Sequence, residues 1–261
     1  MFTGFNVEIE RERNYSDYID RGKEIFAEQR KDIINQLNYY TDSEGIIDGE
    51  QLQKNWFPDI KADIFLSHSH KDEPIALGLA GWLHKEMGLT AFIDSQVWGY
   101  AGDLLREIDK KYCKIEGSDN YDYNKRNFST SHVHIMLSTA LTKMMDNTEC
   151  LFFLNTSNSI SNAKEVIKHE TESSWIYHEI AMMDLIRKKS PEEHREGREG
   201  LQKSAEKRSE ESDQLRIKYS LNLNDLPRLK DFTLLIVAFK AKVNNEHGLD
   251  ALYKYSNIET S

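Results

Sequence analysis

Short apolar runs alternate with amphipathic stretches through the middle of this 261-residue chain. A strand, a helix and a second strand at such spacing predict a βαβ unit, whose strands pair in parallel. We therefore expect an α/β fold with a doubly wound, mostly parallel sheet flanked by helices. The expected strands are ADIFLS at 62–67, LTAFID at 89–94 and CLFFLNTS at 150–157, and the expected helices cover 74–88, 102–113, 129–147 and 171–189.

The two ends of the chain have a different pattern. Residues 1–60 are charged and contain helical periodicity over 16–40 and 48–57, which predicts a helical N-terminal extension. The main domain is expected over 61–261, with a polar loop at 115–127 and a charged, solvated insert at about 190–213. After the insert we expect a fourth strand at 215–222, a closing helix or strand at 231–242, and a last helical turn or two at 247–256.

Polar residues follow each expected strand. In doubly wound sheets, ligands collect outside the carboxyl ends of the strands, so these residues are the candidate site. They lie in three loops on one rim, namely 67–72, 94–102 and 155–158.

The order of three motifs resembles the Toll/interleukin-1 receptor (TIR) domain family. These motifs are DIFLSHSHKDE, then GLTAFIDSQVWGYAGD, then a W-x-x-x-E in SSWIYHEI. They span about Ala62 to Leu185 and match the strand and helix pattern above. The resemblance implies a flavodoxin-like fold. The connection between the second and third strands is longer than a minimal member needs, and the insert and the N-terminal extension lie outside the family pattern.

The resemblance also implies a function. In members that cleave NAD+, the glutamate of W-x-x-x-E is catalytic, which here is Glu179. The implied activity is that of an NAD+ glycohydrolase or ADP-ribosyl cyclase in prokaryotic antiviral defence, which depletes NAD+ or makes an ADP-ribose-derived messenger for a downstream effector. NAD+ is then the substrate, with no further cofactor, and a homo-oligomer is expected. The implied substrate-binding residues are Ser67, His68, Ser69, His70, Asp94, Trp98, Tyr100, Leu104 and Trp175.

Physical chemistry supports a single carboxylate for this reaction. The nicotinamide of NAD+ is already cationic, so it leaves as a neutral group, and the site must stabilise an oxocarbenium-like ribose. Trp175 and Glu179 are four residues apart, so on a helix they share one face, and the indole can form a wall beside the carboxylate. Trp98 and Tyr100 are candidates for stacking on nicotinamide or adenine.

Other interpretations stay open. Glu179 can be a solvent-facing helix residue, Trp175 a core residue, and Asp94 a turn cap. His68 and His70 lack a carboxylate or cysteine at zinc-site spacing, so no metal is expected. Ser67 and Ser69 lack the G-x-S-x-G elbow of a nucleophile, and G-x-G-x-x-G is absent. His132 and His134 are expected on different faces of a helix, one packed and one exposed. The alternative function is a non-catalytic interaction scaffold.

Composition narrows the function further. With 34 basic and 44 acidic residues the net charge is -10, which argues against a nucleic-acid binder. Residues 1–60 hold 7 basic and 13 acidic residues and residues 190–213 hold 5 and 8, so the acidity lies mostly outside the expected site. Two cysteines and no apolar stretch of membrane-spanning length predict a cytoplasmic protein without a membrane segment.

Overall fold

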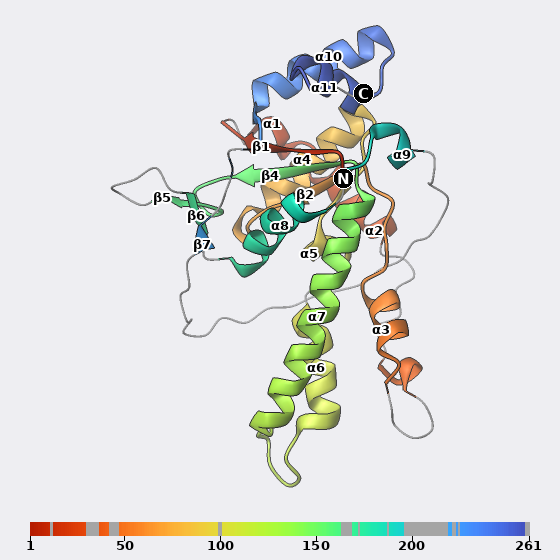
Figure 1. Ribbon diagram of the computed structural model, residues 1–261, viewed down its shortest axis with the longest axis vertical. Coiled ribbons are helices and arrows are strands. Elements are labelled where there is room, and N and C mark those ends of the chain that lie inside the picture. The colour runs from red at the N-terminus through yellow and green to blue at the C-terminus, as the bar shows by residue number, and fades with distance from the viewer. Residues whose placement is uncertain are drawn as a thin grey trace.

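Five parallel strands form the central sheet, and helices flank it (Figure 1). The strands lie in the order β3-β2-β4-β1-β8. They are β1 (Thr3–Glu8), β2 (Ile64–Ser67), β3 (Ala91–Phe92), β4 (Cys150–Asn155) and β8 (Arg228–Lys230). The computed structural model describes residues 1–10, 13–29, 37–41, 47–98, 101–162, 169–171, 173–186, 188–195, 219–220, 223 and 225–258.

Helices connect and cover these strands. Before β2 lie α1 (Arg13–Ser16), α2 (Ile19–Gln29), the 3-10 turn η1 (Leu37–Tyr40) and α3 (Gly49–Trp56). Between β2 and β4 lie the turn η2 (His70–Asp72), α4 (Glu73–Met87), α5 (Asp94–Val97), α6 (Ala101–Ile108), the π-helical turn η3 (Asp109–Cys113) and α7 (Tyr123–Asn147). After β4 lie α8 (Ser174–Leu185), α9 (Pro191–Arg195), α10 (Asp231–Asn244) and α11 (Gly248–Tyr255).

The sheet has the flavodoxin-like, TIR-like arrangement with an unusual chain order. Flavodoxin-like sheets have the spatial order 2-1-3-4-5. Here β2, β3 and β4 occupy the places of the first, second and third strands of that order. The fourth place is filled by β1, from the beginning of the described chain, and the fifth by β8. The expectation of a doubly wound, parallel α/β fold is confirmed.

Strand β1 corrects the expected domain boundary. Residues 1–60 are not a helical extension, because Thr3–Glu8 pairs with β4 along its whole length and Asn6–Glu8 pairs with β8. The side chains of Phe5 and Val7 are fully buried. These first residues therefore form an internal strand of the sheet, and a boundary at residue 60 would divide that sheet.

Layers of helices cover both faces of β1. Successive strand residues point to opposite faces. At Gly4, a Cβ atom would lie 2.9 Å from Sδ of Met183 in α8. The ring of Phe5, on the other face, stacks with that of Tyr253 in α11 at a centroid distance of 6.5 Å. Helices α8 and α11 thus lie on opposite faces of the sheet.

Helix α2 packs on α4 at very short range. A Cβ atom at Gly22 would lie 2.2 Å from the carbonyl oxygen of Leu77, and one at Gly81 would lie 2.2 Å from that of Tyr18. Only glycine permits this approach. The contact holds α4, which follows the first site loop, firmly against the N-terminal helices.

Three further expectations are corrected. The polar loop expected at 115–127 ends early, because Asp122 caps α7 by accepting a hydrogen bond from the backbone N–H of Lys125. Of the fourth strand expected at 215–222, residues 219–220 form β7 in a small antiparallel sheet of order β5-β6-β7, with β5 (Ser161–Asn162) and β6 (His169–Thr171), and 215–218 and 221–222 lie outside the described residues. In the charged insert, expected to be fully solvated, Pro191–Arg195 form the helix α9 with Pro191 and His194 buried, and residues 196–213 lie outside the described part.

The remaining elements agree with the pattern. Strands β2, β3 and β4 and helix α8 lie within their expected ranges, helices α4 and α6 each begin one residue before theirs, and residues 231–242 are helical rather than extended. Every residue of β4 except its last is buried, as its continuous apolar run predicts. No helix in the described ranges is long and apolar enough to cross a membrane.

Candidate functional site

The carboxyl end of the sheet brings the first and third expected loops together. Strand β2 ends at Ser67 and its neighbour β4 at Asn155. The buried carboxylate of Asp72, from the first loop, accepts hydrogen bonds from the Thr156 hydroxyl at 2.5 Å and from the Asn158 amide at 2.7 Å. These bonds fix the rim at the point where strand order reverses, which is where such sheets bind ligands.

Helix α8 directs Glu179 to this rim. Ser173 caps the helix, since its hydroxyl accepts a hydrogen bond from the backbone N–H of Ile176. Two turns later Glu179 is 4% exposed, and it accepts a hydrogen bond of 2.5 Å from the hydroxyl of Ser67. The alternative of a solvent-facing glutamate is therefore wrong.

The carboxyl group of Glu179 is held in an environment that disfavours its charge. Burial, together with the negative charge of Asp94, raises the pKa of Glu179 to about 8, and the Ser67 hydrogen bond opposes this rise. Within the described part of the chain, no cationic side chain pairs with it. At neutral pH the group is mostly protonated.

His68 is the second uncompensated group at the rim. Its side chain is 9% exposed, and neither ring nitrogen makes a hydrogen bond among the described residues. Burial lowers the pKa of His68, against the opposing effect of Asp94. The ring is thus a neutral imidazole with one donor and one acceptor nitrogen available.

Trp175 stands at the side of the site. It is half-buried and packs against the core. The side chain is therefore partly a core residue, and partly available as a wall beside Glu179. Its ring meets those of His134 and His178 edge-on, at centroid distances of 5.8 and 6.4 Å. Nε2 of His178 lies 3.2 Å from the Ser138 hydroxyl oxygen, which links α8 to α7.

His132 and His134 are both exposed on α7, which corrects the expectation that one of them is packed in the interior. Each meets one aromatic ring edge-on. For His132 that ring is Phe128, at a centroid distance of 4.5 Å.

Two expected substrate-binding residues are in the core instead. Trp98 is 2% exposed, its indole N–H donates to the carbonyl oxygen of Pro58, and its ring packs against Phe57 and Phe92. Leu104 is fully buried. Helix α5 follows β3 closely and turns Trp98 inward, so its ring offers no surface for stacking. Tyr100 lies outside the described residues.

The other expected site residues lie at the rim. Ser69 is half-buried and His70 is exposed, in and beside the turn η2. Asp94 is half-buried at the start of α5 and acts electrostatically on both Glu179 and His68. Within the described ranges, no three His, Cys, Asp or Glu side chains converge in a way that could hold a metal ion. The rings of His68 and His70 lie 6.3 Å apart, nearly perpendicular.

Sequence reasoning missed the role of Asp72. Asp72 lies in the first loop, and Thr156 and Asn158 lie in the third. No motif marks Asp72 as the residue that links these two loops. The contact is indicated only by the positions of these residues, because polar side chains that follow neighbouring parallel strands are expected to lie close together.

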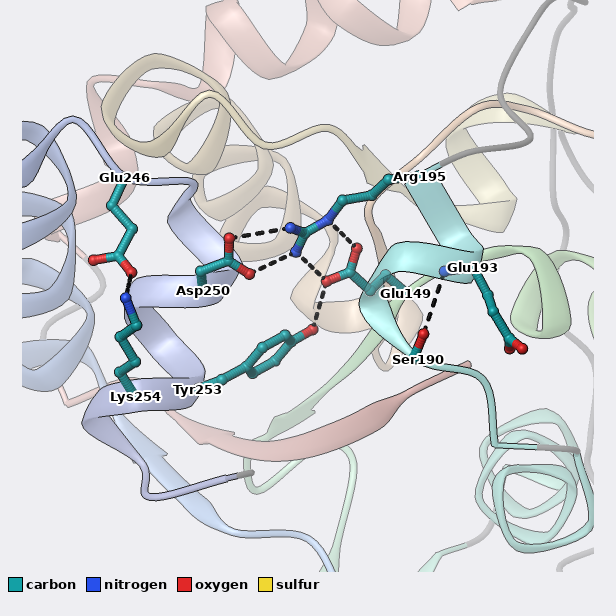
Figure 2. A network of polar contacts seen from close by, with 8 residues as sticks. All are labelled: Glu149, Ser190, Glu193, Arg195, Glu246, Asp250, Tyr253 and Lys254. Atoms are coloured by element: carbon teal, nitrogen blue, oxygen red, sulfur yellow. Dashed lines mark hydrogen bonds and ion pairs between the residues drawn. The ribbon is translucent and has the colours of Figure 1, made fainter. Parts of the chain in front are cut away.

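A second buried glutamate lies at the opposite end of the sheet, where β4 begins. Figure 2 shows its polar partners. Glu149, directly before β4, is fully buried. Arg195 of α9 binds its carboxylate through two nitrogens, at 2.7 and 2.9 Å, and also pairs with Asp250. The hydroxyl of Tyr253 donates to the same carboxylate at 3.1 Å. Burial raises the pKa of Tyr253, and the paired carboxylates raise that of Arg195, so these donors keep their protons.

Comparison with known proteins adds no assignment. No model of a protein family, no curated protein and no solved structure matches the chain. Function is therefore inferred from the cluster of Ser67, His68, Asp94 and Glu179 and from the order of the motifs.

Proposed function

We propose that this protein is an NAD+ nucleosidase that cleaves the bond between nicotinamide and ribose, with Glu179 as the catalytic residue. One observation carries the proposal. A buried carboxyl group, hydrogen-bonded only by the Ser67 hydroxyl and without a described cationic partner, lies at the ligand-binding end of a TIR-like sheet. Such a group is ready to face a cation supplied by a substrate.

The chemistry needs the ionised form of Glu179. As the C–N bond breaks, its electron pair leaves with nicotinamide, and positive charge develops on the ribose. A carboxylate next to that charge stabilises it in a site with little water. A bound cation also favours the ionised form, so substrate binding is expected to lower the pKa of Glu179 from about 8.

The neighbouring groups have supporting roles. The Ser67 hydroxyl holds one carboxylate oxygen in place. His68, neutral and without a hydrogen bond among the described residues, is suited to bind a ribose hydroxyl or the carboxamide of nicotinamide. Trp175 provides a half-buried ring at the side.

The fate of the ribose cation decides the product. Attack by water gives ADP-ribose, and attack by a group of the same nucleotide gives a cyclic product. Either outcome consumes NAD+, which agrees with the proposed role in prokaryotic antiviral defence, by depletion of NAD+ or through a messenger for an effector. We propose a cytoplasmic location, because NAD+ is present there.

The test is a comparison of three proteins incubated with NAD+: the wild type, Glu179→Gln and the control Glu24→Gln. Glu24 is an exposed glutamate of α2, away from the rim. We expect nicotinamide release by the wild type and the control, and a loss of at least about 100-fold in Glu179→Gln. The kcat/KM of the wild type should rise with pH through about 8, as the free carboxyl group ionises. Equal activity of wild type and Glu179→Gln would refute the proposal.

A second candidate function is a non-catalytic scaffold, and the outer face of α10 favours it. Phe232, Leu235, Phe239 and Val243 recur at helical spacing, and each is at least 41% exposed. A row of this kind suits self-association, in line with the expected homo-oligomer. If the wild type releases no nicotinamide at any protein concentration, while Phe239→Ser abolishes self-association seen by sedimentation, the scaffold is the better interpretation.

A further inference from the structure

A cavity whose lining does not include Glu179 lies between α3, η3 and α7. Its volume is about 730 Å³, within the range of small-molecule sites. Figure 1 shows α6 and α7 running together away from the sheet, with α3 nearby. The cavity is formed on this projection, where the chain makes the π-helical turn η3.

The floor of the cavity is apolar and deep. Leu52 from α3, Ile108 from α6 and Cys113 from η3 line it, and each is 9% exposed or less. Phe128 and Met136 of α7 form a wall, and Phe128 is 69% exposed, which marks the mouth. An apolar body that entered here would leave water for a surface of aliphatic and aromatic carbon.

The polar groups of the lining favour a negative charge. Lys125, at the mouth, makes no side-chain hydrogen bond or ion pair among the described residues. The hydroxyl oxygen of Tyr112 is buried and lacks a hydrogen-bond partner there. The carboxylate of Asp109 lies close by but is already neutralised by Arg126 at 2.8 Å and bound by the Ser129 hydroxyl.

We propose that this cavity binds an aliphatic monocarboxylate of fatty-acid type, with its chain against Leu52, Ile108 and Met136 and its carboxylate at Lys125 and Tyr112. A single unpaired lysine matches a single negative charge, whereas a phosphate monoester brings about two. The Tyr112 hydroxyl supplies the hydrogen bond that a buried oxygen otherwise lacks. The site is separate from the proposed reaction, so its test does not depend on that reaction.

The test is calorimetric titration of the full chain with decanoate, and with decanol as the uncharged match. We expect one saturable site for decanoate per chain, with decanol binding about tenfold more weakly because it lacks the charge. Lys125→Met should weaken decanoate binding about tenfold and leave decanol unchanged. The control Lys143→Met, an exposed lysine of the same helix outside the lining, should change neither.

A second variant tests the location. At Gly49, a Cβ atom would lie 3.4 Å from the methyl carbon of Met136, which also lines the cavity, so Gly49→Leu adds side-chain volume at the cavity wall. Circular dichroism checks that the variant is folded. We expect it to weaken both probes. The proposal is overturned if neither probe binds, if decanol binds as tightly as decanoate, or if both Lys125→Met and Gly49→Leu bind decanoate like the wild type.

Discussion

Glu149 and Glu179 lie at opposite ends of the parallel strands, and both are almost completely buried. Glu149 accepts hydrogen bonds from two guanidinium nitrogens of Arg195 and from the hydroxyl of Tyr253, so it has a cationic partner, which it shares with Asp250. Glu179 accepts one hydrogen bond, from the hydroxyl of Ser67, and is close enough to the negative charge of Asp94 to be affected by it. The first arrangement stabilises the fold. The second leaves a buried carboxyl group without a cationic partner among the described residues, which favours the binding of a positively charged ligand.

The largest expected effect comes from removing the cationic partner of Glu149, which leaves it without such a partner among the described residues, as Glu179 is. Arg195→Met leaves a buried carboxylate with only Tyr253 as donor, and should lower the free energy of unfolding by about 3–5 kcal/mol. Urea denaturation measures this value. The double variant Arg195→Met with Glu149→Gln should recover a large part of the loss, because it removes the buried charge. Equal losses in the single and double variants would contradict this account.

The next prediction concerns pH. The pKa of Glu179 is raised from its ordinary value of 4.5 to about 8, so between these values the folded state binds a proton more tightly than the unfolded state. The contribution of Glu179 to the free energy of unfolding is therefore fully present below about pH 4.5. It is lost as the pH rises through 8. Relative to Glu179→Gln, the wild type should lose up to about 1.4 kcal/mol of unfolding free energy per pH unit across this window.

Denaturation of both proteins at several pH values from 5 to about 9 measures this difference. The control pair is the wild type and Glu24→Gln, whose difference should stay constant over the same range because Glu24 is exposed. A constant difference for Glu179→Gln as well would show that Glu179 is already ionised at neutral pH.

Removing the hydroxyl group that donates a hydrogen bond to each glutamate sharpens the comparison. Tyr253→Phe should cost about 1 kcal/mol at any pH from 6 to about 9, because Arg195 still compensates Glu149. Ser67→Ala should cost about as much at pH 6 but more at about pH 9, where Glu179 must ionise without the hydrogen bond from Ser67. The same denaturation series reports both variants. A pH-dependent cost for Tyr253→Phe and not for Ser67→Ala would reverse our interpretation.

The smallest effect is expected from Asp94→Asn. Asp94 raises the pKa of Glu179, so its neutralisation should lower that pKa by a fraction of a unit to about one unit. Asp94 also raises the pKa of His68, which should fall in the variant. Carbon-13 NMR titration of glutamate carboxyl groups, assigned with Glu179→Gln, measures the first shift. An upward shift would contradict the proposed repulsion.

Much of this sheet could be predicted from sequence, because β2, β3 and β4 are apolar runs with clear limits. Strand β1 was missed because TGFNVE contains a glycine and a central asparagine, which are untypical of a buried strand. Strand β8 has three residues with one buried side chain, and it exists because β1 lies beside it. Such strands are determined by their partners rather than by local pattern.

The candidate site was predictable to the same extent. The W-x-x-x-E spacing placed Glu179 correctly on a helix facing the rim, since the spacing itself defines a helical face. It does not reveal that Ser67 is the one donor to Glu179 among the described residues, because that depends on the packing of α8 against β2. The polar stretch around Trp98 predicts an exposed ring, whereas the single turn α5 directs it inward.

Strand β1 precedes every other strand in the described part of the chain, yet both of its neighbours, β4 and β8, lie far along the chain. The pairing of Thr3 with Cys150 must close a long loop before any hydrogen bond compensates its entropy. Until then, β4 presents an unpaired apolar edge, which can associate with other chains. Refolding is therefore expected to be slow and sensitive to protein concentration, and a chaperone that shields this edge should raise the yield.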